Sequence, residues 1–80
     1  MILRVRDGAC LVFKRNPLHL RFEIEASHHG LESKLLWTSM SLKHVNREKG
    51  MQLMREMHAR YKEDPELMVA DMVACDLKPY

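Results

Sequence analysis

The chain has 80 residues, of which 46% are hydrophobic and 30% charged, and its formal net charge is +2. A chain of this length predicts a single small domain over residues 1–80, because its core is thin and leaves no room for a second domain or a deep, enclosed active site. Residues 1–60 hold eleven Lys/Arg against six Asp/Glu, a basic bias too weak to be typical of a dedicated nucleic-acid-binding protein, although it does not exclude one.

The first residues predict a β-hairpin. Ile2 to Arg6 alternates apolar and basic side chains, which is typical of a strand with one buried face. Asp7-Gly8 is a signal for a type I′ turn, since Gly tolerates a positive φ. Cys10 to Lys14 is then expected to return as the second strand, with Leu11 and Phe13 on its core side.

A third strand is predicted from Leu18 to Ala26, after a turn at Asn16-Pro17. This stretch has the strictest period-two alternation in the chain, so one of its faces must be covered by apolar groups. The apolar face holds Leu18, Leu20, Phe22, Ile24 and Ala26, and the polar face holds His19, Arg21, Glu23 and Glu25.

A fourth strand is predicted from Lys34 to Leu42, with Leu36, Thr38, Met40 and Leu42 on the core side. A helix over Leu31–Met40 is the alternative. In the strand interpretation Leu35 and Trp37 share the opposite side and form an exposed apolar patch, which suits a partner-binding surface because Trp is enriched among interface anchors. A register slip of one residue would exchange the two faces.

Two helices are predicted after the strands. The first begins at Asn46 as its N-cap and runs to Tyr61, and Gly50 lies inside its apolar stripe, which indicates a close approach of the helix backbone to the sheet. The second begins at Asp64-Pro65 and runs to about Asp76. This second helix is apolar nearly all round, so we expect part of it to bind a partner or a second copy of the chain. The flank expected to do so holds Met68, Met72 and Cys75.

These elements predict an α+β domain, an antiparallel meander sheet of three to four strands packed by two C-terminal α-helices. The segment Leu20 to Met54 resembles one unit of the YegP-like family of small ββα domains, through FEIEA at Phe22 to Ala26, Gly30, LLWTSMSL at Leu35 to Leu42 and REKGMQLM at Arg47 to Met54. Members of that family often carry two such units in tandem. The resemblance therefore implies that a single unit pairs with another molecule, and it implies no catalytic residues.

Sequence motifs for chemistry are weak. His28-His29 lie in a Gly-bounded loop, but no further ligands stand at the spacing of a zinc site. No nucleophile elbow, phosphate loop or Cys-His signature frames the Ser, His and Asp residues. We therefore expect no enzyme activity, no metal or other cofactor and no small-molecule substrate.

The number of cysteines and the length of the apolar runs predict where in the cell the protein lies. Two cysteines are few for a small secreted domain, so Cys10 and Cys75 are expected to be reduced thiols in the cytoplasm, with a bridge between them as the alternative. Charged residues from Arg4 to Asp7 interrupt any signal-peptide run, and no run approaches the roughly 20 apolar residues of a membrane span.

Two functions are compatible with these observations. The first is a non-enzymatic protein-binding module that forms a homodimer or docks on a larger protein, in the manner of a phage- or mobile-element-encoded inhibitor such as an anti-CRISPR protein. Its expected partner-binding residues are Leu35, Trp37, Met68, Met72 and Cys75. The alternative is a nucleic-acid-binding domain that grips phosphates with the basic outer face of the sheet, through Arg4, Arg6, Lys14, Arg15 and Arg21. Glu23 and Glu25 on the same face oppose that alternative.

Overall fold

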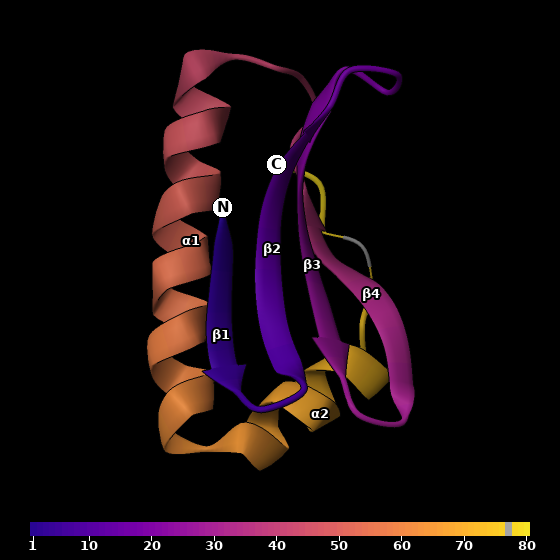
Figure 1. Cartoon of the computed structure of the whole chain (residues 1–80). Coiled ribbons are helices and arrows are strands. Elements are labelled where there is room, and N and C mark those ends of the chain that lie inside the picture. Colours follow the sequence, from indigo (N-terminus) through magenta and orange to yellow (C-terminus); the bar gives the residue numbers. More distant parts are fainter. Residues whose placement is uncertain (77) are drawn as a thin grey trace.

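The computed structural model describes residues 1–76 and 78–80, which form a four-stranded antiparallel sheet followed by two helices (Figure 1). The sheet order is β1-β2-β3-β4, a meander, so the predicted α+β fold is confirmed. The elements are β1 (Ile2–Arg6), β2 (Ala9–Asn16), β3 (Arg21–His28), β4 (Leu31–Thr38), α1 (His44–Glu63) and α2 (Pro65–Val73).

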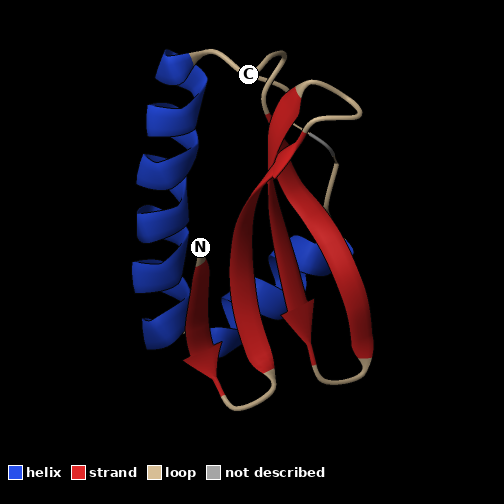
Figure 2. Cartoon of the chain, turned by 45° about the horizontal axis from the view of Figure 1, so that its top comes forward, coloured by secondary structure: helices blue, strands red, loops and turns tan. Residues whose placement is uncertain are grey.

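One face of the sheet is covered by both helices, which share a single core with it (Figure 2). Helix α1 lies along β1, β2 and β3, and α2 packs against α1 and β4. Phe13, Ile24 and Trp37 are partners across β2, β3 and β4, so their side chains lie on this covered face. The opposite face of the sheet is covered by neither helix and is called the outer face below.

The turn between β1 and β2 differs in type from the prediction. Gly8 has the positive φ of 76° that favours glycine, but Asp7 does not have a positive φ, so the turn is not type I′. The hairpin is irregular because the pairing register shifts between Arg4 and Arg6. The imidazole of His29 lies directly over Gly8, where a Cβ would overlap the ring.

The third strand begins later than predicted, at Arg21. The side chains of Leu18 and Leu20 are 83% and 64% exposed, so the first part of the predicted apolar face does not reach the core. The reason is the turn before β3, in which the Asn16 side chain accepts a hydrogen bond from the backbone N–H of His19. Leu20 leaves this turn with a φ of 52°, a left-handed conformation that does not fit a strand.

The fourth strand has a different register from the prediction, and the alternative helix is not formed. Leu35 pairs with Glu25 and Trp37 pairs with Ile24, so one extra residue on β4 forms a bulge. The bulge turns Trp37 onto the covered face, where it is only 5% exposed, while Met40 is 72% exposed. Leu35 and Trp37 therefore do not share an exposed patch.

Helix α1 is longer than predicted, and its N-cap is Lys43 rather than Asn46. Asn46 is buried, and its side-chain amide donates to Ser41 of the preceding loop. The expected close approach at Gly50 is confirmed. A Cβ at this position would lie 2.3 Å from Cε2 of Phe13 and 2.9 Å from Cζ3 of Trp37.

Helix α2 begins at Pro65 as predicted, but the Asp64 side chain makes no capping hydrogen bond and the helix ends at Val73. Beyond it, Pro79 forms a parallel bridge with Thr38. The Tyr80 N–H donates to the Thr38 carbonyl at 2.8 Å, so the C-terminal residues line the free edge of β4.

The two helices are joined by a hydrogen bond of 2.7 Å from the Tyr61 hydroxyl to Asp71. Burial, together with this bond to a carboxylate, raises the pKa of Tyr61 well above its ordinary value of 10.0. The unfolded chain releases the phenol proton near pH 10 while the folded chain retains it. The contribution of Tyr61 to the free energy of unfolding is therefore fully present below about pH 10 and is lost as the pH rises further.

Tyr61→Phe is expected to remove this alkaline loss of stability. At neutral pH the variant is expected to lose about 1.5–3 kcal/mol, the usual contribution of a hydrogen bond to a charged group. Urea unfolding from about pH 8 to about pH 11 measures both effects. Tyr80→Phe is the matched control because Tyr80 is half-exposed. If the free energy of unfolding falls in parallel for the native protein and for Tyr61→Phe as the pH rises, the alkaline loss of stability is not caused by Tyr61.

Candidate functional site

The residues expected to bind a partner are mostly enclosed by the chain itself. Met68 and Met72 are 0% and 1% exposed, so the prediction that they form an exposed flank of α2 is wrong. The physical reason is that α2 packs on α1 and β4, which buries this flank in the common core. Cys75 is half-buried and its thiol donates to the Leu35 carbonyl. Val73 is the exposed large apolar residue of α2, at 71%.

The basic residues of the outer face are largely paired with carboxylates. Arg21 contacts Glu23 at 2.8 Å, and Lys14 contacts Glu25 at 2.9 Å. The hydrogen bond to Glu25 raises the pKa of Lys14 above its ordinary value. Glu23 is only 2% exposed although neither helix covers it. The outer face is therefore an internally neutralised network rather than a set of free cations.

The other basic residues do not complete a common phosphate-binding surface. Arg4 forms a long, exposed ion pair of 3.8 Å with Asp7, and Arg6 lies against the ring of His28. Arg15 pairs with Phe22 across the strands, so its side chain lies on the covered face, opposite to Lys14. The five predicted residues are thus divided between both faces of the sheet.

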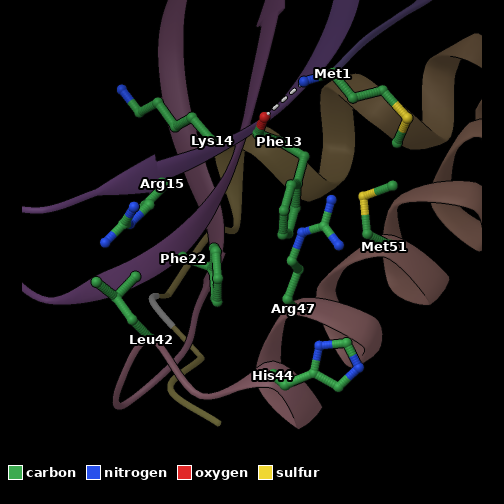
Figure 3. A pocket seen from close by; sticks show the side chains of 9 residues that line it. All are labelled: Met1, Phe13, Lys14, Arg15, Phe22, Leu42, His44, Arg47 and Met51. Carbon is green, nitrogen blue, oxygen red and sulfur yellow. Dashed lines mark hydrogen bonds between the residues drawn. The ribbon is translucent and has the colours of Figure 1, made fainter.

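A pocket of about 530 Å³ lies between the first turns of α1 and the far end of β2. It is lined by residues of β2, β3, the loop after β4 and α1, together with the residue that precedes β1 (Figure 3). The lining residues are Met1, Phe13, Lys14, Arg15, Phe22, Leu42, His44, Arg47 and Met51. We call this feature the cationic pocket.

The floor of the cationic pocket is apolar. The rings of Phe13 and Phe22 are stacked with centroids 5.5 Å apart, and Leu42 and Met51 complete the apolar lining. Figure 3 shows Arg47 extending from α1 to lie beside Phe13. The combination suits a ligand that carries both apolar groups and negative charge.

The ionisable side chains at the rim of the cationic pocket are all basic. Its basic residues are Lys14, Arg15, His44 and Arg47, and no Asp or Glu of the described chain lines it. Lys14 and His44 have carboxylate partners nearby, Glu25 and Glu48, whereas Arg15 and Arg47 form no ion pair with any residue that the structure describes. These two guanidinium groups are therefore the ones available to an anionic ligand.

No protein-family model, curated protein or solved structure matches this chain. The resemblance to YegP-like domains accordingly stays a prediction from the sequence.

A second cavity of about 370 Å³ lies between α1, α2 and β4. Trp37 and Cys75, two of the predicted partner-binding residues, line it. Its charged lining residues are of both signs, Arg60 and Lys78 against Asp71 and Asp76, so it shows no preference for a charged ligand.

Metal and membrane features are not seen in residues 1–76 and 78–80. Within these ranges no group of three His, Cys, Asp or Glu residues could hold a metal ion. Across the same part of the chain, neither helix has the length and apolar character needed to cross a bilayer. Cys10 and Cys75 are both free, and the alternative bridge between them is not formed.

Sequence reasoning named Lys14 and Arg15 but missed the α1 side of the cationic pocket. His44, Arg47 and Met51 are spaced at i, i+3 and i+7, which places them on one side of a helix. That spacing was a readable signal. His44 was missed because the predicted helix began at Asn46, whereas Arg47 and Met51 lay inside the predicted helix and were not recognised as part of a site.

Proposed function

We propose that this chain is a non-enzymatic protein-binding module that holds an acidic segment of a partner protein in the cationic pocket. The observation that carries the proposal is the pair Arg15 and Arg47, two guanidinium groups beside an apolar floor with no carboxylate in the lining. Arginine is suited to bidentate contacts with carboxylates, and the apolar floor adds burial for a neighbouring side chain.

The nucleic-acid alternative draws less support from the same geometry. Single-stranded nucleic acid stacks successive bases on aromatic faces, but Phe13 and Phe22 are stacked on each other and do not form a row of separate platforms. On the outer face, Arg21 and Lys14 would have to give up their carboxylate partners to contact phosphates. A protein ligand with few negative charges and one apolar anchor fits the pocket better.

An inhibitory role is part of the proposal. A small module that covers an acidic surface of a larger complex would block that surface, as a phage- or mobile-element-encoded inhibitor of the anti-CRISPR type does. The protein partner can also be a second copy of this chain. Sedimentation of the purified protein detects such a homodimer.

The double variant Arg15→Gln with Arg47→Gln is expected to weaken binding of an acidic peptide about tenfold or more, since tenfold corresponds to only 1.4 kcal/mol. The probe is a fluorescent heptapeptide that alternates Glu and Val, and fluorescence anisotropy measures its Kd. The matched control is Arg55→Gln with Lys62→Gln, which removes the same charge from exposed positions of α1 outside the pocket.

Three further arms decide the outcome. A peptide with Gln in place of Glu is expected to bind poorly, and added salt is expected to weaken the acidic peptide because exposed charges are screened. A single-stranded oligonucleotide tests the alternative. Equal loss of affinity in both double variants, or binding of the oligonucleotide without the peptide, would contradict the proposal.

A further inference from the structure

Exposed apolar side chains gather at one end of the molecule. Two of them lie in the turn between β2 and β3, one in the loop between β4 and α1, and one in the first turn of α1. In chain order they are Leu18, Leu20, Met40 and Val45, and each is more than half exposed. Figure 1 and Figure 2 show the turn and the loop at the end where α1 begins. We call the surface formed by these four residues the apolar end.

The turn and the loop are held together by hydrogen bonds. The Phe22 N–H, just after the turn, donates to the Ser39 hydroxyl at 2.7 Å, and the Ser39 N–H donates to the Phe22 carbonyl at 2.9 Å. In the loop, the buried Asn46 side chain donates to the Ser41 carbonyl at 3.2 Å. The two segments therefore form one connected surface.

Leu20 indicates that the apolar end is not a by-product of core packing. Its φ of 52° is a left-handed conformation, which costs free energy for a bulky residue and suits Gly or Asn better. The side chain is 64% exposed, so burial in the core does not offset this cost. Backbone strain of this kind is typical of positions that contact a ligand.

The segments that carry the apolar end are basic. Residues 14–21 and 39–47 hold no Asp or Glu and five Lys/Arg, namely Lys14, Arg15, Arg21, Lys43 and Arg47. Lys14 and Arg21 are paired with carboxylates, and Glu48, which follows the second segment, is paired with His44. Arg15, Lys43 and Arg47 form no ion pair within the described part of the chain. Exposed apolar groups therefore stand beside uncompensated positive charge.

The other end of the molecule has the opposite charge. Residues 63–71, which end α1 and form most of α2, hold four Asp/Glu and no Lys/Arg. Figure 1 shows α2 at the end of α1 that lies away from the turn and the loop. An anionic surface would thus attract the apolar end and repel the α2 end, which sets the orientation of the molecule.

We propose that the apolar end docks on the surface of an anionic lipid bilayer, with Leu18 and Leu20 inserted among the acyl chains and Lys43 against the headgroups. The inference goes beyond the proposed function because its four apolar residues lie outside the cationic pocket. A protein partner is typically held by anchors in pockets, but none of the four lines either cavity described above. A bilayer instead accepts separate exposed apolar side chains beneath a layer of negative charge.

Leu18→Ser combined with Leu20→Ser is expected to weaken binding to anionic vesicles about tenfold, because both leucines lose their burial among acyl chains. The vesicles contain phosphatidylserine and phosphatidylcholine in equal amounts, and sedimentation of the vesicles measures the bound protein. The matched control is Ile2→Ser with Val73→Ser, which removes two side chains of similar exposure outside the apolar end. Vesicles of phosphatidylcholine alone are expected to bind much less protein. Circular dichroism melts check folding.

A second measurement reports insertion directly. Leu18→Trp places a fluorescent ring at the apolar end, and lipids with brominated acyl chains quench a ring that enters the hydrocarbon. Quenching is expected for Leu18→Trp and not for Val73→Trp, the control at an exposed position of α2. Trp37 contributes the same buried background to both variants.

The failure of this inference can be told apart from the failure of the proposed function. No binding to the anionic vesicles, equal weakening in both double variants, or no quenching of Leu18→Trp would overturn lipid docking while binding of the Glu/Val heptapeptide stood. If Leu18→Ser with Leu20→Ser weakens the peptide rather than the vesicles, the apolar end belongs to the protein-binding surface and lipid docking is overturned. Vesicle binding without peptide binding would overturn the proposed function alone.

Discussion

Met68→Asp is expected to destabilise the domain severely, by more than about 4 kcal/mol. Met68 is 0% exposed and belongs to the core shared by α1, α2 and the sheet. A carboxylate at this position would lose its hydration without a partner, and destabilisation beyond about 4 kcal/mol is typical of such buried charges. The total stability of a domain of this size is roughly 4–12 kcal/mol, so a loss of this size removes about a third of it at the upper end and all of it at the lower end.

The matched control for this result is Val73→Asp. It introduces the same charge into the same helix, but Val73 is 71% exposed and the substitution is expected to change stability by less than about 0.5 kcal/mol. Urea unfolding followed by circular dichroism compares the two variants. Equal stability of Met68→Asp and Val73→Asp would show that α2 is not packed in the core, and would restore its buried flank as a partner surface.

Gly50→Ala is expected to destabilise the protein by about 2–3 kcal/mol, although the same change in an ordinary helix stabilises by about 1 kcal/mol. The added Cβ would lie 2.3 Å from the Phe13 ring and 2.9 Å from the Trp37 ring, so α1 or both rings must move. Phe13 has little freedom because it is stacked on Phe22. The same movement is expected to disturb the floor of the cationic pocket and weaken peptide binding.

Two further variants test this explanation. Ala59→Gly, at an exposed position of α1, measures the ordinary helix-propensity difference of about 1 kcal/mol. Phe13→Leu combined with Gly50→Ala should cost less than the sum of the single changes, because a smaller side chain at position 13 relieves the overlap. Additive effects in this cycle, or stabilisation by Gly50→Ala alone, would contradict the close approach.

The fold class could be predicted because its signals are local. Alternation at period two in the first half, a helical period after Asn46 and Pro65 at a helix start identified the order and type of the elements. Gly50 was also predictive, since a glycine inside an apolar helical stripe needs a reason and close packing supplies one. None of these inferences required knowledge of which segments of the chain contact one another in the folded structure.

The cationic pocket was only half predictable. Lys14 and Arg15 were identified as candidate binding residues, but in the wrong setting, because one face of the sheet was assumed for both. Alternation along β2 places them on opposite faces. The apolar floor at Phe13 and Phe22 was treated as core alone, since sequence does not show where a core opens to the surface.

The amino-acid sequence by itself determined which segments become strands and helices, because burial of an apolar face imposes a period on the residues that form it. Tertiary structure alone decided the direction of Trp37 and the burial of Met68 and Met72. These depend on the bulge in β4 and on the packing of α2. Each is set by pairing between segments distant in the chain, which no local pattern encodes.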